Sequence, residues 1–127
     1  MISRTASVAT AQRSSRRTRT PRSTDPPQRF VVFGDGGSGT PVEKAVAYRT
    51  YLQKPDYVLI TGDIVYSRGR ASEYDASFWP IYNAETASRA SGSPLLRSTL
   101  YVAAAGNHDI AARDLGRYPD GLAYFFN

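Results

Sequence analysis

Residues 30–37 read Phe-Val-Val-Phe-Gly-Asp-Gly-Gly, an apolar run that ends in a glycine-rich turn carrying a carboxylate. The same order recurs in residues 57–63, Tyr-Val-Leu-Ile-Thr-Gly-Asp, and in residues 100–107, Leu-Tyr-Val-Ala-Ala-Ala-Gly-Asn. The apolar runs are short and nearly continuous, which predicts parallel strands covered on both faces. The sequence therefore predicts an α/β fold in which each strand delivers an oxygen-bearing side chain just past its end.

Helical signals lie between the apolar runs and give the order β-α-β-α-β from residue 30 onward. Thr40 is a suitable N-cap, Pro41 fits the first helical position and Glu43 completes a capping box, so a helix is expected to begin here. It is expected to end before Pro55. Its apolar residues fall close to one face and are expected to pack on the sheet: Val42, Ala45, Val46, Tyr48 and Leu52.

A second, weaker helix is expected over residues 72–82. Tyr74, Phe78 and Ile81 share one face, and Pro80 predicts a kink or an early end. Phe78 and Trp79 are both expected in the core. Residues 122–126, Leu-Ala-Tyr-Phe-Phe, are typical of the start of a further strand.

The chain divides into a basic leader and one domain. The net charge of the 127 residues is +5, but residues 1–29 alone hold seven arginines and a single acid, so that residues 30–127 carry −1. The leader is rich in Arg, Ser, Thr and Pro and has almost nothing to bury, which predicts disorder. Residues 30–127 are long enough for one domain.

Composition narrows the possible partners and compartments. The chain has no cysteine, which excludes disulfides and thiolate metal sites. It has no apolar run of the roughly 18 residues that a membrane span needs, so no membrane partner is expected. Arg16 and Arg17 are not followed by an apolar segment, which argues against a secretory signal. The leader is weakly transit-peptide-like and leaves localisation open, and a nucleic-acid partner is not expected, although arginines do bind phosphates.

Oxygen donors gather at the strand ends. Asp35, Asp63, Tyr66 and Asn107 each lie on a loop that follows an apolar run, and the carboxyl ends of parallel strands are where α/β proteins bind ligands. Carboxylate, amide and phenolate oxygens are ligands for hard cations, and the phenolate favours Fe(III). His108, the single histidine, is adjacent to Asn107 and is a candidate proton donor to a leaving group. Two cations at such an edge would hold a phosphate and activate water.

The first loop also has a competing interpretation as a nucleotide site. Gly34, Gly36 and Gly39 satisfy the G-x-G-x-x-G spacing between a strand and a helix. However, Pro41 at the first helical position leaves Gly39 outside the helix, and Asp35 would direct a negative charge at a pyrophosphate. A non-catalytic nucleotide-binding βαβ module therefore remains the alternative rather than the leading hypothesis.

Together the three loops resemble a known set of motifs. The segment Gly34-Asp35-Gly36-Gly37 has the form G-D-x-G, residues 62–66 have the form G-D-x-x-Y, and residues 106–109 have the form G-N-H-[DE]. In order and in strand context they resemble the first three motifs of the purple acid phosphatases, a branch of the calcineurin-like metallophosphoesterase superfamily. Tyr66, and the absence of a histidine from the first motif, favour that branch.

The resemblance implies a dinuclear centre of Fe(III) with Fe, Zn or Mn. Asp35 and Tyr66 would bind the first metal, Asp63 would bridge the two, and Asn107 would bind the second. His108 would act on the substrate, and the reaction would be hydrolysis of a small phosphomonoester by a metal-bound hydroxide. The implied fold is a four-layer α/β/β/α sandwich, of which residues 30–127 would be the first β-α-β-α-β portion.

The chain also departs from that family. Two further motifs, V-x-x-H and G-H-x-H, would supply histidine ligands, and neither is found in a sequence with one histidine. The chain is therefore expected to be the N-terminal part of a phosphoesterase, inactive without the C-terminal half, or else a degenerate phosphoesterase.

Each of these residues also has a possible structural role. Asp35 and Asp63 could serve only as turn residues, Asn107 could occupy a left-handed turn position, and Asp109 could cap the following segment. Arg68 and Arg70 are candidates to line a phosphate pocket.

Overall fold

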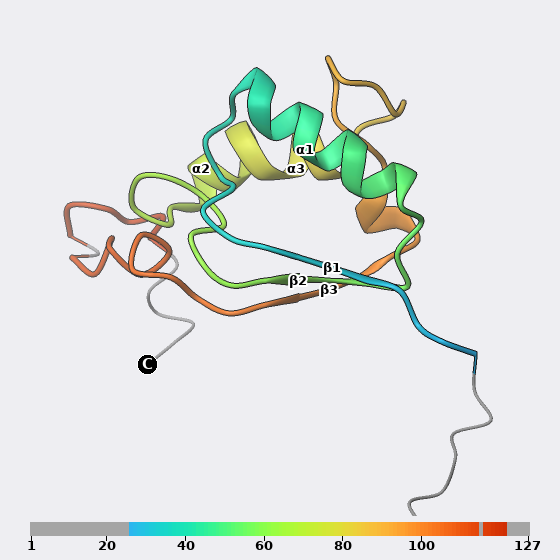
Figure 1. Ribbon diagram of the computed structural model, residues 1–127. Helices are drawn as coiled ribbons and strands as arrows, with labels where there is room; N and C mark the ends of the chain where they lie inside the picture. The colour runs from blue at the N-terminus through green and yellow to red at the C-terminus, as the bar shows by residue number, and fades with distance from the viewer. Residues whose placement is uncertain (1–25, 115, 122–127) are drawn as a thin grey trace, which may run out of the picture.

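The three predicted strands form one parallel sheet. The computed structural model describes residues 26–114 and 116–121, and Figure 1 shows β1 (Phe30–Phe33), β2 (Tyr57–Ile60) and β3 (Leu100–Ala103) side by side in that order. Phe30 pairs with Tyr57, which pairs with Leu100. The predicted α/β class and parallel strands are confirmed; β2 and β3 each end one residue before the predicted strand ends at Thr61 and Ala104. Residues 1–25 of the predicted leader and the strand predicted at 122–126 lie outside the described residues.

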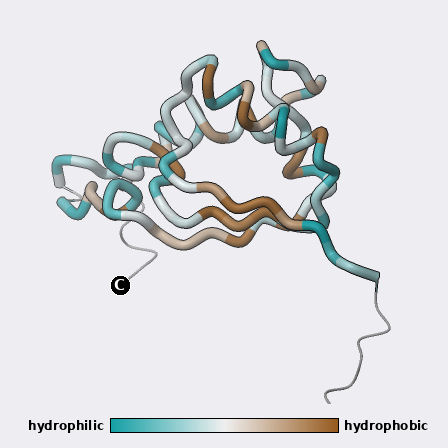
Figure 2. Tube along the Cα trace, viewed as in Figure 1, coloured by the Kyte–Doolittle hydropathy of each residue, from teal (hydrophilic) through white to brown (hydrophobic). Residues whose placement is uncertain are grey.

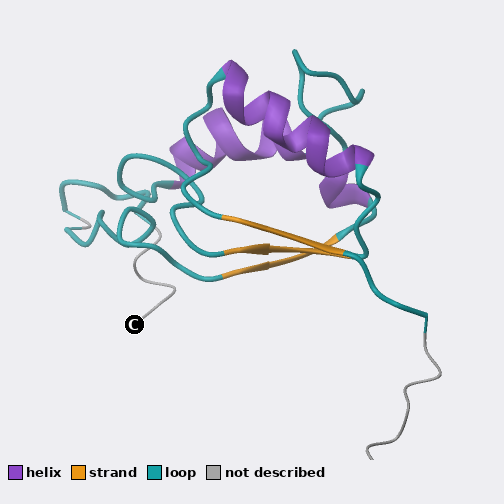
Figure 3. Cartoon of the chain, viewed as in Figure 1, coloured by secondary structure: helices purple, strands orange, loops and turns teal. Residues whose placement is uncertain are grey.

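Every helix in the described part of the chain lies on the same side of this sheet (Figure 3). The longest is α1 (Pro41–Leu52), which follows the first glycine loop. The second helical stretch consists of α2 (Ala71–Glu73), the π-helical turn η1 (Tyr74–Phe78) and α3 (Trp79–Tyr82), and the 3-10 turn η2 (Leu95–Arg97) precedes β3. The helix predicted over residues 72–82 is therefore present. The chain passes Pro80 because the Trp79 N–H reaches back five residues to Tyr74 and Pro80 falls in the first turn of α3, where no intrahelical donor is needed.

The buried face of α1 differs from the predicted one. Its buried residues are Glu43, Ala47 and Thr50, which follow the i, i+4, i+7 spacing of a single stripe. Val42, Val46 and Leu52 are exposed, with Val42 at 71 %, so the prediction that they pack on the sheet is wrong. Ala45 and Tyr48, the other two residues of the predicted face, are half-buried. The Ser93 hydroxyl donates a hydrogen bond of 3.0 Å to the Ala47 carbonyl. The buried stripe of α1 thus contains one apolar residue, Ala47, and two polar ones, Glu43 and Thr50.

The start of α1 also differs in detail from the predicted capping box. Pro41 is the first helical residue as expected, but the Thr40 side chain makes no capping hydrogen bond. Glu43 accepts instead from the backbone N–H of Gly39, one residue before the N-cap. Glu43 is thus bonded to the glycine loop rather than to the cap itself.

The hydrophobic core lies between the helices and the sheet face turned toward them. Phe78 is buried as predicted, whereas Trp79 is 46 % exposed and its predicted place in the core is wrong. The rings of Phe78 and Tyr82 pack at a tilt of 37°, with their centroids 4.9 Å apart. The buried cluster contains Ala47, Val58, Ile60, Val65, Phe78, Ile81, Tyr82 and Leu95.

The opposite face of the sheet is bare among the described residues. Phe30, Val32, Leu100 and Val102 are large, apolar and exposed on this face, with Leu100 at 65 %. Figure 2 shows the strands as the most apolar stretch of the chain while all helices lie on their other side. The prediction that both faces of the sheet are covered is therefore wrong for the residues described. The continuous apolar runs do form strands, but residues 26–114 and 116–121 pack on only one of the two sheet faces.

No helix within residues 26–114 and 116–121 is long and apolar enough to cross a membrane.

Candidate functional site

The loops after the three strands meet at the carboxyl edge of the sheet. The Asp35 N–H donates to the Gly62 carbonyl at 3.1 Å, which joins the first loop to the second. Asp35 and Asp63 both have a left-handed backbone, with φ of 55° and 52°, a conformation that non-glycine residues seldom adopt. Asn107 does not share this left-handed conformation, so the turn position proposed for it from the sequence is not found. The two aspartates therefore share the same backbone conformation just past the ends of β1 and β2.

Tyr66 brings these two carboxylates together. Its hydroxyl donates to Asp35 Oδ1 at 3.1 Å and to Asp63 Oδ2 at 3.4 Å. Partial burial, together with the hydrogen bond and charge of Asp35 and the charge of Asp63, raises the pKa of Tyr66 to about 12. Three oxygens from two loops thus surround one shared proton.

The third loop is tied to the same group through its backbone. Asp63 is buried, and its Oδ1 accepts from the His108 N–H at 3.1 Å. The ring of His108 packs edge-on against Tyr66, with centroids 4.7 Å apart. His108 Nδ1 lies 2.8 Å from the Ser67 carbonyl oxygen; a carbonyl only accepts, so this bond assigns the proton to Nδ1 and leaves Nε2 to meet an external partner.

Asn107 lies in this loop but is the least integrated of the predicted site residues. It is exposed and precedes His108, whose amide binds Asp63. No hydrogen bond of its side chain is found within the described part of the chain. The structure therefore places Asp35, Asp63 and Tyr66 in direct contact, His108 against them, and Asn107 beside them.

Asp109 is a residue whose role sequence reasoning missed. It is 1 % exposed. Its Oδ1 accepts from the N–H groups of Ile64 and Val65 at 2.9 and 3.2 Å, and its Oδ2 accepts from Gly106 at 2.7 Å. The sequence had suggested a different role, capping of the segment that follows Asp109. Asp109 instead joins the second and third loops. No local pattern revealed this, because its main partners are backbone amides more than 40 residues away.

Glu73 holds the end of the second loop in a comparable way. Its carboxylate accepts from the N–H groups of Ser67 and Arg68, at 2.9 and 3.0 Å, and from Arg70 at 2.9 Å. Burial alone would raise the pKa of Glu73, but these hydrogen bonds outweigh it and the pKa is lowered. The carbonyl of Ser67 that meets His108 is therefore part of a fixed turn.

Two glycines are required because the loops touch backbone to backbone. A Cβ on Gly37 would overlap the Ile64 carbonyl and the Val65 backbone, and one on Gly106 would overlap the Asp63 carboxylate and its amide nitrogen. Both glycines belong to the motifs identified in the sequence. Their function is close approach of the loops, which brings the aspartates and Tyr66 into contact.

Arg68 and Arg70, considered for a phosphate pocket, lie beside the site rather than in it. Both guanidinium groups face the ring of Tyr118, at 4.9 and 5.9 Å from its centroid. Arg70 also forms an ion pair of 2.8 Å with Asp120. These arginines have partners of their own, and no contact between them and Asp35 or Asp63 is found in the described ranges.

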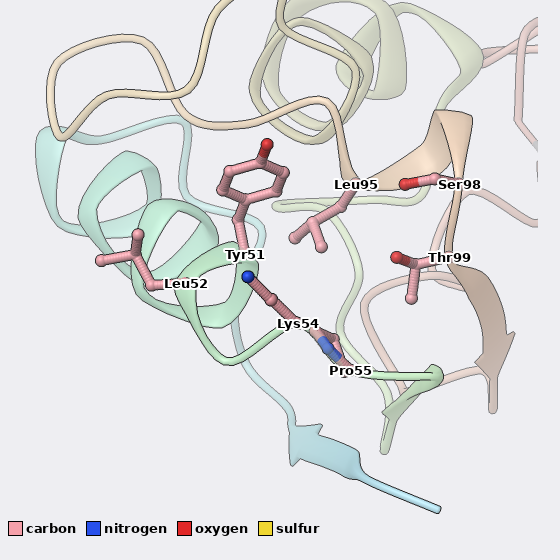
Figure 4. A pocket seen from close by; sticks show the side chains of 7 residues that line it. All are labelled: Tyr51, Leu52, Lys54, Pro55, Leu95, Ser98 and Thr99. Carbon is pink, nitrogen blue, oxygen red and sulfur yellow. The ribbon is translucent and has the colours of Figure 1, made fainter.

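Two cavities bear on where a ligand would bind. One of about 200 Å³ lies behind the first glycine loop and includes Asp35, Gly36, Glu43 and Tyr82 in its lining. The other, of about 370 Å³, is shown in Figure 4. It is lined by Tyr51, Leu52, Lys54, Pro55, Leu95, Ser98 and Thr99, from segments that precede β2 and β3. Only the first cavity contains a predicted site residue.

A cation could be held by a mixed set of oxygens at this edge. Among the described residues no group of three or more His, Cys, Asp and Glu side chains is arranged to hold a metal ion. The candidate ligands are two carboxylates, with a phenol and an amide completing the set. Comparison of the chain with protein-family models, with curated proteins and with solved structures finds no match.

Proposed function

We propose that this chain carries part of the active site of a metal-dependent phosphoesterase that hydrolyses small phosphomonoesters. One observation carries the proposal: the Tyr66 hydroxyl lies within hydrogen-bond distance of both Asp63, from its own loop, and Asp35, from the loop after β1, at the carboxyl edge of a parallel sheet. If the two aspartates served only as turn residues, nothing would require the Tyr66 hydroxyl to bind both of their carboxylates.

The chemistry of this set fits a hard cation. The phenolic proton of Tyr66 now occupies the point on which the carboxylates converge, and a cation would replace it there with three oxygen ligands. Asp35, Tyr66 and Asp63 would hold the first metal, for which the phenolate favours Fe(III). Asp63 and Asn107 would contribute to the second, an Fe, Zn or Mn ion.

Bound cations would polarise the phosphoryl group and lower the pKa of the attacking water. The residues of the chain then have separate tasks. Asp63 orients the third loop through the His108 amide, and the Ser67 carbonyl holds the imidazole through Nδ1, which leaves Nε2 for an external partner. His108 in its protonated form would donate from Nε2 to the leaving oxygen of the ester or to a phosphoryl oxygen.

The bare sheet face supports the wider fold within this proposal. In a four-layer α/β/β/α sandwich, a second sheet would pack on the face that bears Phe30, Val32, Leu100 and Val102, all of which are exposed in the described residues. Such a partner half would also supply the histidine ligands that a chain with one histidine lacks. We therefore expect this chain to bind metal weakly and to turn over a phosphomonoester only together with that half.

The nucleotide-binding alternative has less support. Gly39 lies two residues before the first residue of α1, as Pro41 predicted, whereas the fingerprint places its third glycine at the start of the helix. A degenerate phosphoesterase would keep the same loops, and a measurement of metal binding is what distinguishes it from the proposed enzyme.

Equilibrium dialysis of the chain against Zn(II), and against Fe(III) supplied as a weak chelate, tests the proposal. We expect saturable binding that Asp63→Asn lowers by at least about tenfold. Asp75→Asn, an exposed aspartate in η1, serves as the matched control and should bind like the wild type. Absence of binding, or equal affinity in both variants, would overturn the assignment.

A further inference from the structure

Glu43 occupies a position where an apolar residue would be expected. It lies on the buried stripe of α1 with Ala47 and Thr50, and its side chain is 3 % exposed. Carboxylates are rarely buried unless a partner compensates for lost hydration. The partner here is not a basic side chain but the glycine loop that carries Asp35.

The contacts of this carboxylate end on the backbone of the first loop. Glu43 Oε2 accepts from the Gly39 N–H at 2.5 Å. Two residues earlier in the same loop, the Gly37 carbonyl accepts from the Tyr66 N–H at 3.1 Å, and Asp35 donates to Gly62. The loop is thus held at its far end by α1 and along its length by the second loop.

We propose that Glu43 is a positioning residue that holds the loop 34–39 so that Asp35 meets Tyr66 and Asp63. The inference rests on the proposed function, because positioning matters only if these three oxygens bind a cation. Glu43 itself is not a ligand. It acts through Gly39, and its loss would let Asp35 leave the shared site while the sheet stays intact.

The surroundings of Glu43 make its protonation observable. Burial raises the pKa of Glu43 to about 7, although the amides of Gly39 and Ser38 lower it. The titratable groups near it are the Tyr82 hydroxyl from α3 and Asp35, which lines the same cavity from the first loop. Glu43 Oε1 and the Tyr82 hydroxyl have no hydrogen-bond partner among the described residues. The Gly39 amide should therefore report the ionisation of Glu43.

Three variants separate positioning from a packing role. Glu43→Gln keeps an acceptor for the Gly39 N–H, whereas Glu43→Leu keeps a similar size without an acceptor. Thr50→Val changes a residue of the same buried stripe two turns along α1. Equilibrium dialysis against Zn(II) and Fe(III) should show a loss of at least about tenfold for Glu43→Leu, and affinities within about twofold of the wild type for Glu43→Gln and Thr50→Val. Equal affinity of the Leu and wild-type chains, or of the Leu and Gln variants, would overturn the inference.

Amide NMR supplies a readout that does not need metal. In the wild type, the Gly39 amide proton should shift as the pH passes through about 7, and Glu43→Gln should abolish this transition. If the wild-type chain binds no metal, the proposed function fails, and the Gly39 titration still decides whether Glu43 holds the loop. If Glu43→Leu does not fold, the comparison of the wild type with Glu43→Gln is decisive. A Gly39 amide that titrates in neither protein would refute the contact between Glu43 and Gly39.

Discussion

The buried carboxyl of Glu43 makes the stability of this domain depend on pH in a way that a single substitution removes. The pKa of Glu43 rises from 4.5 to about 7 on folding. Because the folded pKa is the higher one, the folded state favours the neutral acid. The stability that Glu43 contributes is fully present below pH 4.5 and is lost as the pH rises to about 7.

The size of this effect follows from the two pKa values. A tenfold change in a protonation equilibrium is worth about 1.4 kcal/mol, so ionising Glu43 in the folded state costs about 3 kcal/mol relative to the unfolded chain. Glu43→Gln replaces the acid by a neutral group of the same shape and does not titrate. The free energy of unfolding of the variant minus that of the wild type should therefore increase by about 3 kcal/mol between about pH 4 and about pH 8.5.

Urea denaturation followed by circular dichroism at several pH values measures this difference. Other titrating groups are common to both proteins and cancel. Glu85→Gln changes an exposed glutamate and should stay within about 0.5 kcal/mol of the wild type throughout. A difference between Glu43→Gln and wild type that is constant with pH, or that falls as the pH rises, would refute the reasoning.

Three further predictions concern the loops and the sheet. Gly106→Ala should lower Zn(II) affinity by at least about tenfold in equilibrium dialysis, because the added Cβ overlaps the Asp63 carboxylate. Asp109→Asn should lower the free energy of unfolding by about 1–3 kcal/mol in urea, since an amide cannot accept all the backbone bonds that this buried carboxylate accepts. The double variant Val32→Thr, Val102→Thr should bind less of an apolar fluorescent dye and change stability little, because both side chains are on the bare sheet face.

Each of these has a matched control. Gly116→Ala places a methyl at an exposed turn and should leave metal affinity unchanged. Asp75→Asn should leave stability within about 0.5 kcal/mol of the wild type. Val58→Thr puts the same change on the packed face and should destabilise the domain without lowering dye binding. Controls that behave like the test variants would contradict the structural assignments.

The strands, and the meeting of their loops at one sheet edge, could be predicted because both depend on short local sequence patterns. Continuous apolar runs ending at Gly34, Gly62 and Gly106 predict strands followed by tight turns, and parallel pairing then brings the turns to one edge. The contact of Asp35, Asp63 and Tyr66 follows from that topology. The spacing of Tyr66 three residues after Asp63 places both side chains on the same side.

The packing of α1, the exposure of Trp79 and the role of Asp109 were not predictable in this way. Two of these involve partners distant in sequence: Ser93 for α1, and the backbone of residues 64 and 65 for Asp109. For Trp79, the neighbouring Phe78 takes the buried position instead. Covering of the second sheet face was predicted from apolar runs alone. Apolar content indicates that a face can be buried, but it does not identify what covers it.

The central claim is that Asp35, Asp63 and Tyr66 form a cation site, and the visible spectrum of the chain loaded with Fe(III) tests it most directly. A tyrosine oxygen bound to Fe(III) gives a charge-transfer absorption that no other side chain proposed here would produce. We expect this absorption in the wild type and in Tyr48→Phe, and its loss in Tyr66→Phe. A wild-type chain that binds Fe(III) without this absorption, or a Tyr66→Phe chain that keeps it, would contradict the account.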